Sequence, residues 1–439
     1  MAPLYDIVIF GASGFTGKHV LKEALKFLSP NSPLTSLALA GRSSSKLTET
    51  LKWASKTHPT IPILVADTSD PPSLRRMASQ AKLVLNCVGP FRLHSEPVVD
   101  ACVEAGCDYL DICGEPEFME RMEAVYYERA VEMGSLVVSA CGFDSLPAEL
   151  GLMFNLKQWV SPKVPNRVQA YVSLESGKGL VANFATFESA VLGTSNADKL
   201  AKLRRSARRR ARLSIPGYAP PKGPLIEHQK KLGLWAVKLP SADATVVRRS
   251  LSILTNNPSG LQGVSEDPTH AVTRAAFWSN IKPAHFVVKI GTKNLAGILR
   301  YIAVGLSIGL LGRFSLGKWL LLNFPWIFSL GLFKKNGPTD EEIASASFKM
   351  WFLGHGFSDA SHVSDKPNTE IITRVMGPEI GYVTTPIILV QCALTVLKHR
   401  GDLPKGGVFP PGIVFGPTDL QDRLQENGIS FDVVSKSYI

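Results

Sequence analysis

The sequence predicts an α/β protein. It has a parallel sheet covered by helices in about its first third, followed by a mixed α/β region that carries a hydrophobic helical insert. Apolar, β-rich runs alternate with segments of helical spacing up to about residue 145. The run at 83–88 is almost continuously apolar, which is typical of a strand buried on both faces. Further along the chain, two short apolar stretches without acids predict the insert.

The first domain is expected to cover residues 1–145. Its strands are expected at six apolar runs, namely 5–10, 35–40, 61–66, 82–88, 107–112 and 135–140. Helices are expected between them, at 16–28, 44–57, 94–106 and 117–133. Strand-like spacing resumes at 167 and becomes helical near Phe184–Gly193. Residues 146–380 are therefore expected to form a second, mixed α/β domain.

Length and composition describe an ordinary globular protein. The 439 residues are enough for two or three domains of roughly 100–200 residues each. Hydrophobic residues make up 45% and charged residues 19%, which excludes a disordered or collagen-like chain. The six cysteines form no C-x-x-C pair and no zinc spacing, so we expect a reduced, intracellular protein without a metal site. Because the first strand is expected to begin at Tyr5, we expect no cleavable signal peptide.

A glycine-rich turn follows the first expected strand directly. The segment Gly11-Ala12-Ser13-Gly14-Phe15-Thr16-Gly17 is a spacing variant of the dinucleotide-binding fingerprint. Gly11 would permit the tight turn, Gly14 would let the pyrophosphate approach the backbone, and Gly17 would let the helix pack closely. We therefore expect a Rossmann domain whose cofactor-binding residues include Gly11, Ser13, Gly14, Phe15, Thr16 and Gly17. The alternative is an ordinary glycine turn in a non-binding domain.

The second expected strand ends in Gly41-Arg42-Ser43. An NAD site typically has a carboxylate here for the ribose 2′-hydroxyl, whereas a guanidinium suits a 2′-phosphate. Arg42 and Ser43 therefore favour NADP(H), although a solvated surface arginine is the alternative. Asp67, at the end of the third strand, is expected either to contact the adenine or to cap the next helix.

The fourth expected strand ends in Asn86-Cys87-Val88-Gly89-Pro90-Phe91. A Gly-Pro loop at this edge of the sheet is expected to lie along the nicotinamide half of the cofactor. Asn86, Gly89 and Pro90 are accordingly cofactor-binding candidates. A simple strand-to-helix turn is the alternative.

Polar clusters follow two more expected strands, at 109–115 and 139–147. Ligands of open α/β sheets bind beyond the carboxyl ends of the strands, and tyrosine and carboxylic acids can exchange a proton alongside hydride transfer. The site candidates are therefore Tyr109, Asp111, Glu115, Asp144 and Ser145, of which we assign Tyr109, Asp111, Asp144 and Ser145 as catalytic. In the alternative interpretation, Asp144 and Ser145 cap a helix and Asp111 anchors a loop.

Several common catalytic patterns are absent from the sequence. A Tyr-x-x-x-Lys dyad occurs only at 218–222, where Pro220 and Pro221 prevent a helix. The His-Glu-x-x-His, Gly-x-Ser-x-Gly and Walker A patterns do not occur. Metal-hydrolase, α/β-hydrolase and P-loop chemistry are therefore unsupported.

The motifs as a set resemble those of the saccharopine dehydrogenase-like oxidoreductases. They are Gly11–Gly17, Ala40-Gly41-Arg42, Asn86–Pro90, Tyr109-Leu110-Asp111 with Gly114-Glu115, and Gly142–Pro147. The resemblance continues at Gly377–Tyr382, Gly406-Gly407-Val408, Pro410-Pro411-Gly412, 420–424 and 428–431. Bacterial trans-acting enoyl reductases of glycolipid synthesis are similar in the same places. The resemblance implies an oxidoreductase in which residues 381–439, with a helix near 382–399, return to the first domain.

The insert at 295–335 combines apolar character with short length. Its stretches 301–312 and 319–333 are each shorter than the roughly 20 residues that span a bilayer as a helix, and Pro325 is expected to bend the second. Trp319 and Trp326 suit a membrane interface. We expect helices lying on a membrane or lipid droplet, with a buried helix pair or a dimer interface as the alternatives.

A basic run at 199–212 contributes much of the formal net charge of +11. It is expected to attract anionic headgroups, while a solvated helix face or a nuclear-localisation-like run is the alternative. No nucleic-acid-binding module accompanies the run, so we expect no nucleic-acid partner.

Three functions are consistent with these patterns. The first is an NADP(H)-dependent reductase that acts at a membrane on a lipid-like small molecule, with a homodimer as one of its expected assemblies. The second is a saccharopine-type amino-acid dehydrogenase of lysine catabolism, which would need cationic side chains for a dicarboxylic product. The middle of the chain shows no such set. The third is a non-catalytic, nucleotide-binding, membrane-organising protein.

Overall fold

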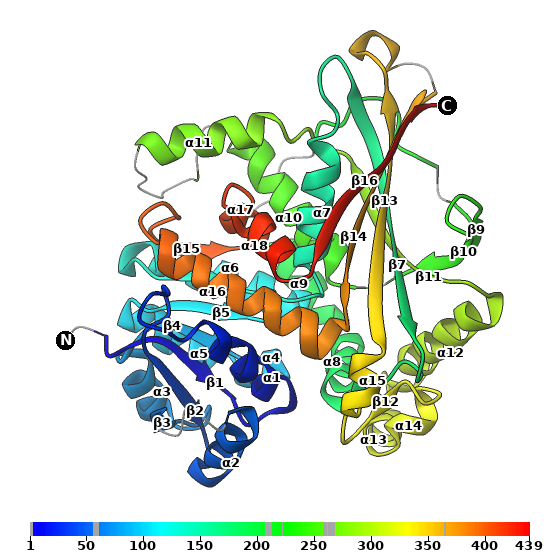
Figure 1. The fold of residues 1–439 in the computed structure, drawn as a ribbon. Coiled ribbons are helices and arrows are strands. Elements are labelled where there is room, and N and C mark those ends of the chain that lie inside the picture. The colour runs from blue at the N-terminus through cyan, green and yellow to red at the C-terminus, as the bar shows by residue number, and fades with distance from the viewer. Residues whose placement is uncertain are drawn as a thin grey trace.

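The computed structural model places two seven-stranded sheets side by side, with helices around and between them (Figure 1). It describes residues 3–55, 61–206, 213–221, 223–239, 241–257, 261, 268–363 and 366–439. The second half of the basic run, 207–212, lies outside the described residues.

The first sheet is entirely parallel. Its strand order is β15-β6-β5-β4-β1-β2-β3. The strands are β1 (Tyr5–Phe10), β2 (Leu37–Gly41), β3 (Ile63–Val65), β4 (Ala81–Asn86), β5 (Asp108–Asp111), β6 (Leu136–Val138) and β15 (Gly407–Phe409). Each of the six expected runs overlaps one of the first six strands, which confirms the Rossmann prediction. The order reverses between β1 and β4, where such folds bind dinucleotides.

Helices cover both faces of the first sheet. On one face α1 (Phe15–Ala24) packs against α2 (Ser44–Ala54) and α16 (Thr385–His399). On the other face, α3 (Pro71–Ala78), α5 (Glu96–Ala105) and α6 (Pro116–Met133) pack in a row. The expected helices correspond to α1, α2, α5 and α6. The sequence analysis did not identify α3, whose mean hydropathy is low because it carries two arginines.

The second sheet is mixed, as expected, with the order β16-β14-β13-β7-β11-β10-β9. The strands are β7 (Val164–Ser176), β9 (Ile226–Gln229), β10 (Leu234–Lys238), β11 (His285–Thr292), β13 (Ala346–Phe357), β14 (Thr369–Pro378) and β16 (Ser430–Tyr438). Only the pair β7–β11 is parallel. The connecting helix α7 (Leu146–Leu156) lies so close to β13 that a Cβ on Gly151 would clash with the ring of Phe352.

The hydrophobic insert forms a group of short helices beside the second sheet. α12 (Leu295–Leu311) and α13 (Ser315–Asn323) are followed by α14 (Pro325–Phe328), so the chain breaks at Pro325. α12 and α13 pack against α8 (Phe184–Ser195). The short strands β8 (Ala182–Asn183) and β12 (Phe333–Lys334) and the helix α15 (Asp340–Ala344) complete the group.

The described part of the basic run lies on α9 (Ala197–Ser206), which packs against α6. Arg204 is paired with Glu120 of α6, and 42% of its side chain stays exposed. Lys199, Lys202 and Arg205 are exposed.

The C-terminal segment contacts both sheets: α16 and β15 lie on the first sheet, whereas β16 pairs with β14 in the second. α16 covers one face, β15 pairs with β6, and Arg400 donates to the carboxylate of Asp108 at the start of β5. Among the described residues, Ile380–His399 is the one helix long and apolar enough to cross a membrane, and its most apolar window is 78% buried in the protein. We interpret it as a core helix. The domain boundaries at 145 and 380 stay predictions.

A buried carboxylate connects three helices in the core between the sheets. Glu149 of α7 accepts hydrogen bonds from the hydroxyl of Ser250 on α10 (Asp243–Asn256) and from the backbone N–H of Gly412 on α17 (Pro411–Phe415) at 3.0 Å. Burial raises the pKa of Glu149 to about 7. Glu149 therefore holds the C-terminal segment in place at Gly412. Because its pKa is raised, the contribution of Glu149 to the free energy of unfolding depends on pH.

Glu149→Gln is expected to flatten the pH dependence of stability. An acid whose pKa is raised by folding stabilises the fold below its unfolded pKa near 4.5, and this contribution is lost as pH rises through about 7. The wild type should lose up to about 3 kcal/mol of unfolding free energy between pH 5 and 8 that the variant keeps. Urea unfolding at both pH values measures this, and equal losses in the two proteins would contradict the assignment.

Candidate functional site

The glycine turn joins β1 to α1 at the carboxyl edge of the first sheet. Gly11 has a φ of 81°, and the carbonyl of Gly11 accepts the N–H of Gly14 at 2.9 Å. Gly17 lies directly against the Gly11 carbonyl, where no Cβ would fit. α1 starts without a side-chain cap, so its first N–H groups are left for a ligand. Ser13 and Gly14 are exposed, and Phe15 and Thr16 are partly exposed beside them.

The loop after β4 faces this turn across the point where the strand order reverses. A Cβ on Gly11 would lie 2.7 Å from a methyl carbon of Val88, so the two backbones approach each other closely. Gly89 is exposed and Pro90 is buried. The glycine turn and the Cys87–Pro90 loop therefore lie side by side at the carboxyl edge of the first sheet, where Rossmann folds have their cofactor crevice.

The ring of Phe15 joins the glycine turn to the C-terminal half of the chain. It contacts Tyr382 edge-on with ring centroids 4.8 Å apart, and a Cβ on Gly337 would clash with it. Tyr382 in turn accepts the N–H of Asn183 at 2.7 Å. Phe15 is thus a packing residue as well as a member of the predicted cofactor loop.

The residues predicted to select the cofactor lie at the ends of β2 and β3. Arg42 is exposed, and its charge helps to lower the pKa of Asp67, after the hydrogen bonds from Ser69. Ser43 caps α2 by accepting the N–H of Lys46. Asp67 accepts both the N–H and the hydroxyl of Ser69, whereas Asp70 occupies the N-cap position of α3. Asp67 therefore shapes the turn, and Arg42 is the unengaged side chain at this edge.

Three predicted site residues meet in a buried network at the ends of β4 and β5. The Tyr109 hydroxyl donates to Asp111 at 2.9 Å and accepts from Asn86 at 2.9 Å. Asp111 also accepts the hydroxyl of Ser139 and the N–H groups of Cys113 and Ala140. All three side chains are completely buried, and burial raises the pKa of Asp111 to about 6. This arrangement favours the loop-anchoring alternative for Asp111.

Asp144 and Ser145 differ in exposure although they are neighbours. The Ser145 hydroxyl is buried and donates to the Ala140 carbonyl at 2.6 Å, so it does not reach a substrate. Asp144 is exposed, yet desolvation by the surrounding protein raises the pKa of its carboxyl group, which indicates a concave surface. Its charge also helps to raise the pKa of Asp243, which burial raises most. Asp144 forms no hydrogen bond or ion pair within the described part of the chain.

An ion pair that the sequence analysis missed lies at the same edge. Arg92 donates from Nε to Glu115 at 2.6 Å, and both side chains are almost fully buried. Glu115 was a site candidate, but nothing in the spacing connects residues 92 and 115. The partnership depends on the neighbouring positions of β4 and β5 in the sheet.

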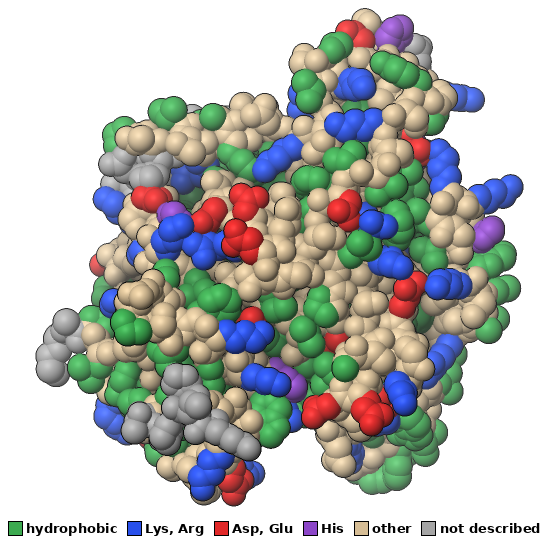
Figure 2. Space-filling model, viewed as in Figure 1, with side chains coloured by type: hydrophobic (Ala, Val, Ile, Leu, Met, Phe, Trp, Pro, Cys, Tyr) green, Lys and Arg blue, Asp and Glu red, His purple; other side chains and the backbone are tan. Residues whose placement is uncertain are grey.

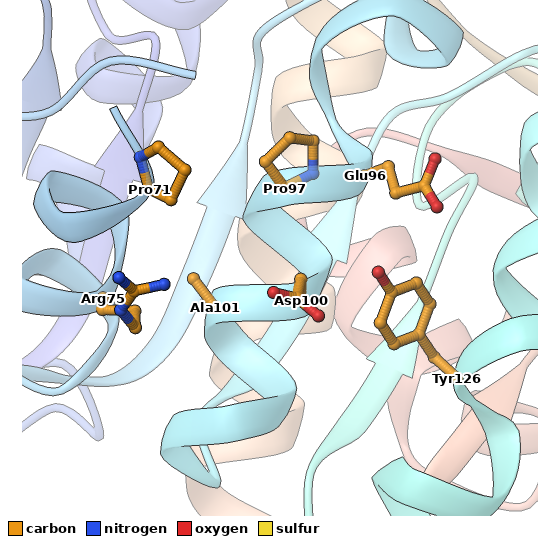
Figure 3. Close-up of a pocket in the computed structure, with 7 residues that line it drawn as sticks. All are labelled: Pro71, Arg75, Glu96, Pro97, Asp100, Ala101 and Tyr126. Carbon is orange, nitrogen blue, oxygen red and sulfur yellow. The ribbon is translucent and has the colours of Figure 1, made fainter. Parts of the chain in front are cut away.

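A hollow in the described part of the structure lies away from the carboxyl edge of the first sheet. It has a volume of about 270 Å³ and lies between α3, α5 and α6, lined by Pro71, Arg75, Glu96, Pro97, Asp100, Ala101 and Tyr126 (Figure 3). These helices cover a face of the sheet, whereas Rossmann ligands bind at the carboxyl edge. We therefore assign the site to the crevice.

The saccharopine dehydrogenase NADP binding domain matches residues 7–138 of this chain, which include the glycine turn, Arg42 and the loop after β4. A relative from Arabidopsis thaliana, named a probable mitochondrial saccharopine dehydrogenase-like oxidoreductase, is 63% identical over 99% of this chain and 97% of its own length. The chain belongs to the saccharopine dehydrogenase-like oxidoreductases. It is an NADP(H)-dependent enzyme of this family.

Two further relatives define how far the similarity extends. The lipid droplet localized protein of Caenorhabditis elegans is 33% identical over 98% of this chain and 99% of its own length. A putative trans-acting enoyl reductase of Mycobacterium tuberculosis is 39% identical over 148 residues, or 34% of each chain. The resemblance to enoyl reductases is thus confined to about a third of this saccharopine dehydrogenase-like chain.

A solved structure shows the same fold. The apo saccharopine dehydrogenase (L-Glu forming) of Saccharomyces cerevisiae superimposes with a TM-score of 0.52 at 12% identity, covering 98% of this chain and 100% of that chain. At this identity the similarity concerns the arrangement of sheets and helices.

Arg42→Ala is expected to weaken NADPH binding about tenfold or more while leaving NADH binding unchanged, because only NADPH carries the 2′-phosphate. Titrations followed by tryptophan fluorescence measure both affinities. Arg75→Ala, which removes the same exposed charge from α3, is the matched control. Equal weakening of NADPH and NADH by Arg42→Ala would contradict the assignment of Arg42.

Proposed function

We propose that this oxidoreductase transfers a hydride between NADP(H) and a lipid-like small molecule while docked on a phospholipid surface. The single observation that carries the proposal is the exposed apolar surface of α12–α14. The surface lies on the same side of the molecule as α8 and α15, which adjoin the first domain (Figure 1).

The exposed surface is large for a protein fully surrounded by water. Large side chains between Leu295 and Leu330 expose 40–70% of their area, namely Leu295, Leu299, Leu306, Leu310, Phe314, Leu316, Trp319, Phe324, Trp326, Ile327 and Leu330. Hydrophobic side chains are visible along the lower right margin of Figure 2, over these helices. Contiguous patches of this kind mark contact with a partner or a membrane.

Both faces of α12 are apolar, but protein covers only one of them. Ile298 and Val304 are buried, whereas Leu299, Leu306 and Leu310 point outward. A helix that is apolar all round is normally buried all round. A lipid surface would cover the second face without requiring the helix to span it, which suits its 17 residues.

The charges around the patch suit phospholipid headgroups. Residues 295–333 contain no acid, and the basic residues are Arg300, Arg313 and Lys318. Arg300 and Arg313 are exposed. Each basic residue near an anionic surface contributes about 1 kcal/mol of attraction. The lipid-droplet name of the worm relative favours a phospholipid monolayer, and the plant relative's name favours a mitochondrial membrane.

Asp144 is the best candidate for the proton donor of the reaction. It follows β6 at the carboxyl edge, it is accessible, and its raised pKa keeps the carboxyl group protonated at higher pH than usual. Tyr109, Asp111 and Ser145 are buried and engaged, and we assign them to holding the loops. Gly114 leaves room for the Asp144 carboxylate, since a Cβ there would lie 2.7 Å from Oδ2.

Activity on a dicarboxylic amino acid has less support. Such a product needs cationic side chains in the crevice. Arg92 is the buried arginine at this edge, and Glu115 neutralises it. A lipid-like substrate remains the better match to the neighbouring apolar helices.

Replacing Leu306 and Leu310 together by glutamate is expected to weaken binding to vesicles about a hundredfold or more, because two exposed leucines would no longer enter the lipid. Co-flotation with vesicles of phosphatidylcholine and phosphatidylserine measures this, and coated oil droplets test the monolayer. Val125→Glu on α6, which is similarly exposed, is the control. Failure of the wild type to float would contradict the lipid surface but not the cofactor assignment.

Asp144→Asn is expected to lower kcat about a hundredfold on a lipid enone or ketone while leaving the affinity for NADPH unchanged, because the amide cannot supply the proton. Stopped-flow oxidation of NADPH measures the step. A variant that keeps full kcat would remove Asp144 from the reaction.

A further inference from the structure

The loop after β4 is held by a carboxylate that belongs to another element. Glu115 accepts the N–H of Phe91 at 2.9 Å and the N–H of Arg92 at 3.3 Å. It also accepts Nε of Arg92 at 2.6 Å. Phe91 and Arg92 are the first residues of the one-turn helix α4 (Phe91–His94), so backbone and side chain at the start of this helix are bound to one carboxylate, just after the exposed Gly89 and the buried Pro90.

These contacts are unusual for a residue at the start of a helix. Glu115 occupies the N-cap position of α6, where a carboxylate would normally accept N–H groups of its own helix. It forms no such cap, and its carboxylate accepts the first two N–H groups of α4 instead. Glu115 therefore caps the neighbouring helix α4, which follows the loop after β4, rather than its own helix.

The second half of the chain completes the arrangement through α8. The Ser189 hydroxyl donates to Glu115 at 3.0 Å, and Nη1 of Arg92 donates to the Leu192 carbonyl at 3.0 Å. The exposed fractions of the Arg92 and Glu115 side chains are 6% and 3%, so water does not compete for these bonds. One ion pair thus connects the loop after β4, the start of α6 and α8.

We propose that Glu115 and Arg92 are positioning residues that hold the Cys87–Phe91 loop against the nicotinamide half of the cofactor. α8, from the second half of the chain, stabilises the ion pair through its hydrogen bonds to both residues. The inference rests on the proposed function only in placing the nicotinamide beside this loop. A buried pair fixes a loop tightly because separating its charges leaves each one without compensation. The adenosine half of the cofactor, near Arg42, is outside its reach.

Two probes separate the halves of the cofactor. NADPH contacts both halves of the crevice, whereas 2′,5′-ADP carries the adenosine and the 2′-phosphate without the nicotinamide. Glu115→Gln is expected to weaken NADPH binding about tenfold and to leave 2′,5′-ADP binding within about twofold of the wild type. Ser189→Ala, which removes one neutral hydrogen bond, is likewise expected to weaken NADPH binding, by about threefold.

Fluorescence titration and calorimetry on the full chain measure the affinity of each protein for NADPH and for 2′,5′-ADP. Arg42→Ala is the control, because it should weaken both probes. Ser189→Ala keeps the test valid if Glu115→Gln does not fold. Equal weakening of NADPH and 2′,5′-ADP by either variant would show a merely structural role and overturn the proposal. A wild type that binds 2′,5′-ADP as tightly as NADPH would place the nicotinamide away from this loop and overturn it as well, while leaving the lipid surface untouched.

Discussion

The candidate site depends on the close approach of two backbones, at Gly11 and at Val88, where the strand order of the first sheet reverses. A side chain at position 11 would push the two loops apart, and a φ of 81° would strain any residue with a Cβ. Gly17 likewise has no room for a side chain, because a Cβ there would clash with the carbonyl of Gly11. The absence of a side chain lets α1 start directly over the turn. The uncapped first turn of α1 lies at this carboxyl edge of the sheet, where its N–H groups would be satisfied by an anionic cofactor.

Buried carboxylates hold the loops at this edge of the sheet. Asp111 binds the turns after β5 and β6, Glu115 binds the turn after β4, and Glu149 binds the returning C-terminal segment. Each lies in a different environment. Glu115 is neutralised by an arginine, whereas Asp111 and Glu149 are served by neutral donors and have raised pKa values. Rigidity at this edge of the sheet therefore has an electrostatic cost, whereas the exposed carboxylate of Asp144 is not used in holding the loops.

Local patterns predicted the first sheet because its strands are short, apolar and separated by helices with clear spacing. The conformation of the glycine turn and the exposed position of Arg42 at the end of β2 were also predictable, whereas their contacts with the cofactor stay predictions. The buried state of Tyr109 was not predictable, since it depends on Asn86 at the end of another strand, and that of Ser145 depends on how the connection after β6 folds back on Ala140. The Arg92–Glu115 pair and its link to Ser189 join residues far apart in the sequence, and no spacing encodes them. Arg204 was expected to face lipid, and its pairing with Glu120 became apparent only from the packing of α9 on α6.

The helix α8 links the apolar insert to the cofactor crevice. Phe187 and Val191 of α8 are buried against Val304 of α12, Leu321 of α13 and Leu332, while Ser189 of the same helix bonds to Glu115. The outward side chains of α12, such as Leu306 and Leu310, take no part in that packing. Inner and outer faces of the insert are thus separate. A lipid surface can cover the outer face without disturbing the contacts that hold α8, because those contacts are already fully buried in the protein. The crevice can therefore keep one geometry on and off the surface, and docking would serve to bring an apolar substrate to a site that is already formed.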